Sequence, residues 1–406
     1  MVSEHRPFTL RPFRGLRFDP ATVGDLGSVI SPPYDVLDAD TVRDLEAANR
    51  HNVVRLILSR RFERPYLAVR ERLQLWRTRS YLRPDAVPAL YLYEYTVGDV
   101  RVRGLVGLVG LRQESERVVL PHEDVMPGPV DDRAVLMRTT GTNLEPILLV
   151  HEGTQRLRDL IGRAAGEPTT ADFVALDRSR HRLWLLTDEA LLAAVADELA
   201  GTRALIADGH HRYAAYLRLQ GELRDGATPG DASPWDHGLA LLVDQHDHPL
   251  LVGPIHRSVA ALTLADHADV CGDGSDALAR ASDREAAFET RAVRAADPAT
   301  AAFVVSDGRS WAVLTTERRH DVDAAVLHEQ LFPLWGVAEE QVGYHHSLDQ
   351  ALQTTTRQPG IVVAVHPPTV AEVMDVAARG VRMPRKSTSF APKPAMGVVM
   401  RDLHDS

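Results

Sequence analysis

The sequence is poor in several residue types, and each shortage excludes a class of protein. It holds one cysteine, Cys271, in 406 residues, which excludes a disulfide framework and a zinc site built on several cysteines. No apolar run reaches the roughly 18 residues that a membrane span requires. The first residues also lack the apolar stretch of a secretion signal. We therefore expect a cytoplasmic protein with no membrane partner.

Positive charge is also in deficit. The chain has 56 acidic and 46 basic residues, a formal net charge of −10. Nucleic-acid binding needs clustered positive charge, so we expect no nucleic-acid partner. Hydrophobic residues make up 44% and charged residues 25% of the chain, as in average globular proteins. The sequence leaves the oligomeric state open, a homodimer included.

The order of apolar patterns predicts a mixed α/β (α+β) fold. We expect an N-terminal α/β region over residues 1–187 and a C-terminal α/β region over residues 188–406. The loops are expected at 31–36, 119–131 and 224–235. Strands are expected within 10–30 and at 89–97, 104–111, 146–150, 183–186, 204–207, 238–244, 249–253, 301–305, 310–315 and 360–365. Helices are expected at 41–49 (capped by Asp40), 64–80, 132–140, 188–200 and 210–223, within 272–300, and at 322–334, 347–355 and 368–379.

Lysine is almost absent, and its distribution is informative. The 46 basic residues comprise 44 arginines and two lysines, Lys386 and Lys393, which lie close together in one segment. On a solvated surface arginine replaces lysine readily, but not where a compact ammonium on a flexible stem is needed. We therefore interpret both lysines as functional, the alternative being chance retention.

The strongest local motif is Asp208-Gly-His-His-Arg212, between an apolar strand and a predicted helix. The start of a helix presents free backbone amides and a partial positive charge, which suit a phosphate. Arg212, with His210 or His211, would reinforce such a site. Asp208 could orient a hydroxyl, hold Mg²⁺ or act as a base. The alternative is that Asp208 caps the helix and the histidines pack or face water.

Two further segments combine charged and hydroxyl side chains. Residues 121–133 hold His122, Glu123 and Asp124, then Asp131, Asp132 and Arg133, which suits a metal site or an acid–base pair as well as a solvated acidic turn. Residues 384–393 hold Lys386, Ser387, Thr388 and Lys393. They lack the glycines of a P-loop, but a lysine beside two hydroxyls makes a plausible phosphate or carboxylate clamp.

Other motifs carry weaker signals. Tyr34-Asp35 follows two prolines in a rigid loop. Ile255-His-Arg257 and Tyr344-His-His also place polar side chains together and are weak candidates for a functional site. His246 and His248 have metal-like spacing, but their surroundings predict a hairpin turn. Cys271 lies in a Gly/Asp loop without an obvious partner. Neither a dinucleotide-binding Gly-x-Gly-x-x-Gly nor a Gly-x-Ser-x-Gly elbow is present.

Taken in order, the motifs resemble a widespread bacterial family catalogued mainly as a domain of unknown function and sometimes associated with serine metabolism. The resemblance spans residue 11 to about residue 400. Asp124 stands where threonine is expected and Ser389 where an aromatic residue is expected, which leaves the substrate open. The motifs are Pro12-Phe-Arg-Gly-Leu-Arg17, Pro32-Pro-Tyr-Asp-Val36, Pro121-His-Glu123, Asp132-Arg133, Ala207-Asp-Gly-His-His-Arg-Tyr213, Pro254-Ile-His-Arg257 and Met383-Pro-Arg-Lys-Ser-Thr388 with Phe390, Pro392 and Lys393.

More remotely, Asp208-Gly-His-His-Arg212 resembles the helix start of the ParB/sulfiredoxin superfamily, which includes kinases of free serine. This likeness implies a ParB/sulfiredoxin-like core with additional α/β elements. It also implies a nucleotide-dependent phosphotransferase, with Mg²⁺ and ATP or ADP, acting on a small-molecule substrate such as free serine. Two alternatives stay open: a non-catalytic nucleotide-binding switch, and a hydrolase or transferase of a phosphate-bearing metabolite.

On this interpretation the candidate residues take four roles and converge on one pocket. Catalytic roles go to Asp208, Glu123, His122 and His210. Nucleotide or phosphate binding goes to Gly209, His211, Arg212, Lys386, Ser387, Thr388 and Lys393. Substrate binding goes to Tyr34, Asp35 and Arg133, and metal binding to Glu123 and Asp132.

Overall fold

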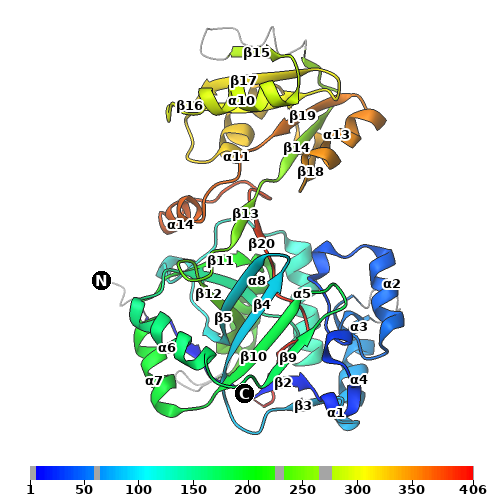
Figure 1. The fold of residues 1–406 in the computed structure, drawn as a ribbon, viewed down its shortest axis with the longest axis vertical. Helices are drawn as coiled ribbons and strands as arrows, with labels where there is room; N and C mark the ends of the chain where they lie inside the picture. The colour runs from blue at the N-terminus through cyan, green and yellow to red at the C-terminus, as the bar shows by residue number, and fades with distance from the viewer. Residues whose placement is uncertain (1–5, 59–64, 225–232, 265–276, 406) are drawn as a thin grey trace. The chain divides into compact units, whose positions relative to one another are not determined.

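The computed structural model describes residues 6–58, 65–224, 233–264 and 277–405. It divides the chain into two compact units (Figure 1). Unit 1 contains residues up to Pro121, Val125–Leu250 and Pro392–Ser406. Unit 2 contains His122–Asp124 and Leu251–Ala391. The predicted division between residues 187 and 188 does not coincide with these units, because strands on both sides of it pair in one sheet.

Unit 1 is built on a large mixed sheet. Its strand order is β6-β11-β8-β12-β5-β4-β10-β9, with β1 paired to β5. The β6–β11 and β8–β12 pairs are parallel, and the other pairs are antiparallel. These strands are β1 (Leu10–Arg11), β4 (Leu90–Val97), β5 (Val100–Gly110), β6 (Val119–Leu120), β8 (Ile147–His151), β9 (Ala171–Val174), β10 (Arg180–Leu186), β11 (Ala204–Asp208) and β12 (His237–Asp244).

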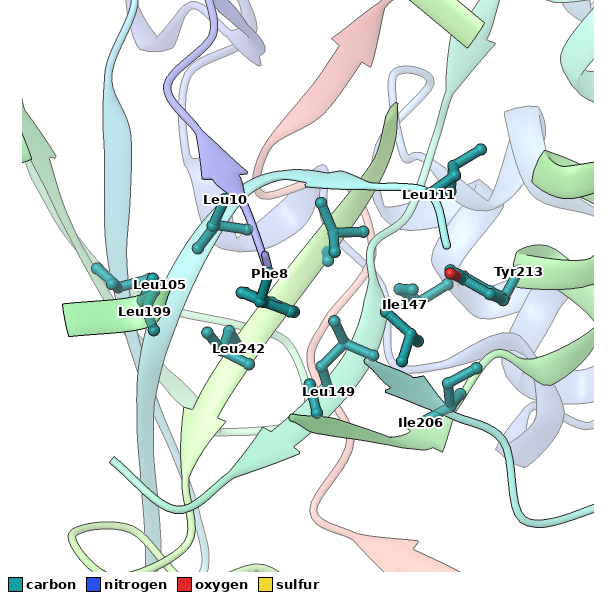
Figure 2. Close-up of a cluster of buried hydrophobic side chains, with 14 of the residues drawn as sticks. Phe8, Leu10, Leu105, Leu111, Ile147, Leu149, Leu199, Ile206, Tyr213 and Leu242 are labelled. Atoms are coloured by element: carbon teal, nitrogen blue, oxygen red, sulfur yellow. The ribbon is translucent and has the colours of Figure 1, made fainter. Parts of the chain in front are cut away.

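The main core of unit 1 lies between this sheet and its helices. Alternate strand residues such as Ile147, Leu149 and Leu242 point into it, and Tyr213 joins them from a helix (Figure 2). Strand residues at i and i+2 share a face, so the opposite face of β4 carries Tyr91, Tyr93 and Tyr95. The helices are α1 (Pro20–Val23), α2 (Ala39–Ala48), α3 (Val54–Ile57), α4 (Pro65–Thr78), α5 (Pro127–Thr140), α6 (Gln155–Ala165), α7 (Glu189–Leu199) and α8 (His210–Arg224).

The C-terminal segment returns to unit 1 and completes it. A small sheet in the order β3-β2-β21-β7 joins β2 (Gly15–Phe18), β3 (Leu82–Pro84), β7 (Thr142–Asn143) and β21 (Met400–Asp402). A second core beneath it includes Leu16, Trp76 and Met400. Residues from the two ends of the chain therefore share one hydrophobic cluster.

Unit 2 has an antiparallel sheet in the order β15-β17-β16-β19-β14-β18. One face packs on α10 and α13 through residues such as Ala287 and Ala351, and the other packs on the α11–η5–α12 segment through Leu327 and Phe332. The strands are β13 (Leu251–Gly253, paired with β20), β14 (His256–Ala260), β15 (Ala277–Ala281), β16 (Thr300–Ser306), β17 (Trp311–Glu317), β18 (Val342–His345), β19 (Gly360–Ala364) and β20 (Ser389–Ala391), and the helices are α10 (Arg284–Arg294), α11 (Asp323–Ala325), the π-helix η5 (Val326–Leu331), α12 (Phe332–Leu334), α13 (Leu348–Arg357) and α14 (Val370–Ala378).

The mixed α/β class is confirmed, and three local predictions are corrected. Asp38, not Asp40, caps α2, because its side chain accepts the Thr41 amide at 2.7 Å. Helix α5 begins at Pro127 rather than at residue 132, since proline fits the first turn of a helix, where its missing N–H is not needed. The 272–300 segment includes β15, not helices alone, because Ala277–Ala281 pairs with β17.

Two other segments differ less from expectation. The 31–36 segment holds a single 3-10 turn, η2 (Tyr34–Val36), after its two prolines. The predicted loop over 224–235 falls largely outside the described residues. Within the described part of the chain, no helix is both long and apolar enough to cross a bilayer.

Candidate functional site

The end of β11 and the start of α8 form the centre of the candidate site in unit 1. Asp208 ends the buried strand, Gly209 has a φ of +95°, and the helix begins at His210. A Cβ atom on Gly209 would lie 2.9 Å from Ile147 Cγ2 and 3.2 Å from the Arg212 guanidinium. Glycine is therefore required both for the positive φ and for the close approach of Arg212.

Charged side chains from three separate segments meet at Asp208. Arg212 Nη2 donates to Asp208 Oδ2 at 2.6 Å, and the Lys393 ammonium lies 2.7 Å from Asp208 Oδ1. Lys393 also donates to Asp35 Oδ2. Lys393 thus bridges two carboxylates, one after β11 and one in the Pro-Pro-Tyr-Asp loop. The structure thus places three predicted site residues, Asp35, Asp208 and Lys393, in contact.

The protonation states of this cluster follow from its charges. Burial opposes ionisation of Asp208, yet Arg212 and Lys393 together hold its pKa below the ordinary value. Burial also opposes a charged Lys393, but Asp208 and Asp35 raise its pKa above the ordinary value. Both groups are therefore ionised at neutral pH, and each keeps the other charged.

A further carboxylate, that of Glu145, lies beside this cluster. Glu145 is buried, with its Oε1 3.8 Å from Arg212 Nε and 3.7 Å from Arg133 Nη1. Burial raises the pKa of Glu145, and the two arginines act in the opposite direction. The Arg133 guanidinium lies 5.1 Å from the centre of the Tyr34 ring, within cation–π range.

Tyr34, Asp35, Glu145, Asp208, Arg212 and Lys393 line one cavity within unit 1. Its walls come from four segments: the loop with Tyr34 and Asp35, the Glu145-Pro146 dipeptide before β8, the β11–α8 junction, and residues 393–396. Its charged side chains are two cations, Arg212 and Lys393, and three carboxylates, Asp35, Glu145 and Asp208. They leave room for about one water molecule, so an ammonium, carboxylate or phosphate group would enter by replacing one of the internal ion pairs.

The predicted histidines lie at the start of α8 as well. His211 Nε2 accepts the Met126 amide at 3.1 Å, so a neutral His211 carries its proton on Nδ1. His210 is partly exposed in the first turn. Asp132 accepts the Tyr66 hydroxyl at 2.5 Å and Arg133 Nη2 at 2.8 Å. The roles predicted for these residues stay predictions.

Two tyrosines that the sequence analysis missed hold the segment with Lys393. The Tyr95 hydroxyl donates to the Pro392 carbonyl at 2.7 Å, and the Ala395 backbone amide hydrogen-bonds to the Tyr93 hydroxyl. The two rings stack at 5.2 Å. Their signal in the sequence was the alternation Tyr91, Tyr93, Tyr95, which places three hydroxyls on one face of a strand.

A buried hydrogen-bond chain continues from Tyr93. Its hydroxyl lies 2.8 Å from His181 Nδ1, His181 Nε2 lies 2.7 Å from Ser179 Oγ, and Ser179 Oγ donates to Asp177 at 2.5 Å. Every member is satisfied if Tyr93 donates to His181 and the histidine proton sits on Nε2. The chain therefore fixes the Tyr93 hydroxyl, and with it the backbone two residues after Lys393.

Glu145 is the other residue that the sequence analysis missed. It precedes Pro146 and a strand that is buried throughout. A carboxylate directly before such a strand was the available signal, because it must be paired when it is drawn into the interior.

The remaining predicted residues form a separate group within unit 2. Both oxygens of Glu123 accept hydrogen bonds from the 386–388 loop: Oε2 from the Lys386 amide at 3.3 Å, and Oε1 from the amides of Ser387 and Thr388 at 3.0 and 3.2 Å. The Thr388 hydroxyl lies 3.2 Å from the same Oε1 and 2.8 Å from His122 Nε2. Burial raises the pKa of Glu123 despite these donors.

The two predicted metal ligands, Glu123 in unit 2 and Asp132 in unit 1, both accept hydrogen bonds from protein donors. The described residues contain no group of three or more histidine, cysteine, aspartate or glutamate side chains arranged to hold a metal ion. The metal-binding roles of Glu123 and Asp132 stay predictions.

The weaker motifs have mixed outcomes. His246 and His248 lie in a turn after β12, and His248 is buried. The predicted hairpin is wrong, because the next strand, β13, pairs with β20 and not with β12. Cys271 lies outside the described residues. Arg257 and Tyr344 face each other on the paired strands β14 and β18 of unit 2.

Comparisons with known proteins give a family and a set of distant folds. A family model described as "Protein of unknown function (DUF1015)" matches residues 10–338. No curated protein matches the sequence. Among solved structures, the chain is similar to a free serine kinase in complex with AMP, at 17% identity and a TM-score of 0.37, over 70% of this chain and 88% of the kinase.

Two other solved structures show a similar likeness. A conserved hypothetical protein from Pyrococcus furiosus matches at 16% identity and a TM-score of 0.37, over 71% of this chain and 93% of that one. SbnI with a C-terminal truncation, from Staphylococcus aureus, matches at 12% identity and a TM-score of 0.36, over 70% and 82% of the two chains. At these scores the likenesses carry no argument about activity.

Proposed function

The chain belongs to the DUF1015 family, and from the site in unit 1 we propose that it is a nucleotide-dependent phosphotransferase whose acceptor is a small hydroxy-amino acid, free serine first. The observation that carries the proposal is the Lys393 ammonium between Asp35 and Asp208, with Arg212 on the far oxygen of Asp208. This arrangement offers partners for an amine, a hydroxyl and a phosphoryl group within one cavity.

The acceptor is held by charges that already pair with each other. Asp35 and Tyr34 receive its ammonium, and Arg133 receives its carboxylate. Asp35 is free to exchange partners, because its carboxylate is still 40% exposed while it contacts Lys393. A zwitterion can therefore replace internal ion pairs by equivalent ones, so that no charge is left buried and unpaired.

The phosphoryl group is held on the other side of Asp208. The backbone at Gly209, the His211 side chain and Arg212 bind the nucleotide phosphates at the start of α8. Lys393 moves from the carboxylates toward the transferred group and neutralises its developing charge. Positioning and charge stabilisation of this kind supply most of the catalysis in phosphoryl transfer.

The chemical step is an in-line displacement. The acceptor hydroxyl oxygen forms a bond to the terminal phosphorus, and the bond from that phosphorus to the bridging oxygen of the nucleotide breaks. Asp208 receives the hydroxyl proton, and the shortened nucleotide leaves with the electron pair of the broken bond. The low pKa of Asp208 keeps it ionised and ready to accept a hydrogen bond from the hydroxyl.

The test is a substrate panel on the full chain. The purified protein is incubated with Mg²⁺, with ATP, ADP or CTP, and with pooled free amino acids, and nucleotide conversion is followed by mass spectrometry. We expect conversion that depends on one hydroxy-amino acid and yields its phosphomonoester. Lys393→Met should abolish this conversion, and Arg319→Ala, a surface charge removal in unit 2, should not change it.

Three other results would contradict the proposal. Thermal stabilisation by a nucleotide without conversion would indicate a nucleotide-binding switch. Release of phosphate from a metabolite without any nucleotide would indicate a hydrolase. Conversion that persists in Lys393→Met would place the reaction elsewhere on the chain.

A further inference from the structure

Unit 2 contains a buried guanidinium that lacks a carboxylate partner. Arg257 is fully buried on β14. Its Nε donates to His328 Nε2 at 2.9 Å, and its Nη1 donates to the Ile255 carbonyl. Its Nη2 has no hydrogen-bond partner among the described residues. No carboxylate among the described residues forms an ion pair with it.

Such a charge is costly for the folded protein. Removing an ion from water costs several kcal/mol unless an opposite charge and full hydrogen bonding compensate for it. Burial lowers the pKa of Arg257 to about 10, and Glu123 and Glu339 only partly offset that effect. The folded protein therefore keeps a cation where a neutral side chain would be more stable, which is typical of a binding site.

A second cation lies on the same aromatic ring. The Arg257 guanidinium carbon is 4.6 Å and Lys386 Nζ is 5.1 Å from the centre of the Tyr344 ring. Lys386 has an exposed side chain, and no carboxylate among the described residues pairs with it. One of only two lysines in the chain therefore adds an unpaired charge beside the buried arginine.

Two histidines and two carboxylates lie around the two cations. Burial lowers the pKa of His328 and His256 to about 4, so both are neutral at pH 7. The Glu339 carboxylate accepts the Tyr344 hydroxyl at 2.5 Å. Glu123 is engaged by the amides of the 386–388 loop. Both carboxylates act on Arg257 through space, but among the described residues neither forms an ion pair with Arg257 or with the Lys386 ammonium.

We propose that unit 2 carries a phosphate-binding site of its own, in which Arg257 Nη2 and Lys386 Nζ bind the oxygens of a phosphate group beside the Tyr344 ring. A guanidinium supplies directed N–H donors and an ammonium supplies a mobile charge, a combination suited to a tetrahedral oxyanion. The flexible stem of Lys386 lets the ammonium swing outward for ligand entry. The site stands independently of the phosphotransferase proposal, because binding requires no turnover.

The test is calorimetric titration of the full chain with inorganic phosphate, with thermal unfolding followed in parallel. We expect saturable binding that Lys386→Ala and Arg257→Met each weaken by about tenfold or more, the loss that follows from removing a hydrogen bond to a charged group. The control Arg319→Ala, a surface charge removal in unit 2, should bind phosphate as the parent does. Lys393→Met, which alters the cavity of unit 1, tests whether the binding that is observed belongs to that cavity instead.

Arg257→Met separates a binding role from a structural one. Replacing an uncompensated buried charge by an apolar side chain of similar length should leave the midpoint of thermal unfolding unchanged or raise it, while phosphate binding is lost. Three results would overturn the proposal. They are an absence of saturable binding, loss of binding in Lys393→Met but not in Lys386→Ala, and a large fall in the unfolding midpoint of Arg257→Met.

Discussion

The Lys393 ammonium lies 2.7 Å from Asp208 Oδ1 and also contacts Asp35, so one lysine joins the first and last parts of unit 1. The side chain of Lys393 is 17% exposed. A cation held between two carboxylates in such a position fixes both of them. The Lys393 side chain therefore sets where the two carboxylates lie in the cavity.

Lys393→Met should lower both stability and turnover. It leaves Asp208 with Arg212 as its remaining cationic partner and Asp35 without one. We expect a loss of roughly 1–3 kcal/mol of unfolding free energy, below the values found for fully buried pairs because water still reaches the cluster. Urea unfolding measures the loss, and nucleotide conversion measures activity. Lys393→Arg keeps the charge and should recover most of the stability but not the turnover; full activity in that variant would contradict the mobile role of the lysine.

Gly209→Ala should lower both stability and activity, whereas a glycine-to-alanine change elsewhere in the same segment should not. The new Cβ would meet Ile147 at 2.9 Å, at a φ of +95° that side chains rarely adopt. We expect a loss of about 1–3 kcal/mol, together with reduced activity because Arg212 is displaced. Gly221→Ala is the matched control within α8. Nothing lies within 4 Å of its Cβ, so it should stabilise the protein by about 0.5–1 kcal/mol. Equal effects of the two substitutions would contradict the account of the β11–α8 junction.

Tyr95→Phe should loosen the 392–395 segment while the fold is kept. It removes the hydroxyl that bonds to Pro392 and should cost about 0.5–1.5 kcal/mol. Because Tyr95 acts through the backbone beside Lys393, we expect a rise in KM for the acceptor larger than the fall in kcat. Tyr344→Phe, in unit 2, removes a hydroxyl outside the cavity and should leave KM for the acceptor unchanged. An unchanged KM in Tyr95→Phe would indicate that the stacked tyrosines serve packing alone.

Stability should fall on mild acidification because of buried histidines such as His181. Burial lowers the pKa of folded His181 to about 4, whereas the unfolded chain binds the proton near its ordinary value of about 6.5. The stability that this neutral histidine contributes is complete above pH 6.5 and is lost as the pH falls toward 4. The slope is at most about 1.4 kcal/mol per pH unit for one group. Unfolding free energies at pH 7.5, 6 and 5 should show a smaller decline in His181→Gln than in the parent; parallel curves would contradict the assignment.

Glu123→Ala should release the 386–388 loop. The carboxylate accepts three consecutive backbone amides, and Lys386 is held at a φ of +54°, a strained value for a residue with a side chain. We expect hydrogen exchange at the amides of Ser387 and Thr388 to quicken by about tenfold or more. Asp124→Asn changes the neighbouring, largely exposed carboxylate and should leave these amides protected. Unchanged protection in Glu123→Ala would show that the loop keeps its shape without the carboxylate.

The local elements were the most predictable part of the fold. Residues 204–207 are a short apolar run, and residues 188–200 are an Ala/Leu-rich stretch that ends at Gly201, so β11 and α7 follow from the local pattern. The grouping into units was not predictable in this way. Residues 392–406 return to unit 1 after unit 2 is complete, and sheet pairing between distant strands leaves no periodic signal in a single sequence.

The site was predictable to the extent that its residues were unusual for their context. The two lysines were conspicuous in an arginine-rich chain, and Asp208 and Arg212 were conspicuous between apolar segments. Glu145 and Tyr95 looked ordinary, because a carboxylate beside a proline and an aromatic residue in a strand each have a common structural explanation. Only the tertiary contacts give them a place at the cavity.

Because unit 1 is formed by segments before and after unit 2 in the sequence, the residues of its cavity are not all synthesised at the same stage of translation. The segment that supplies Lys393 leaves the ribosome only after all of Leu251–Ala391 has been synthesised. A nascent chain can build the large sheet early, but it holds Asp208 and Asp35 without their shared cation until that late segment arrives. A chain released before residue 392 would therefore contain a nearly complete large sheet but would lack the cation that Asp35 and Asp208 share. The charged cavity can form only once the chain has been translated past Lys393.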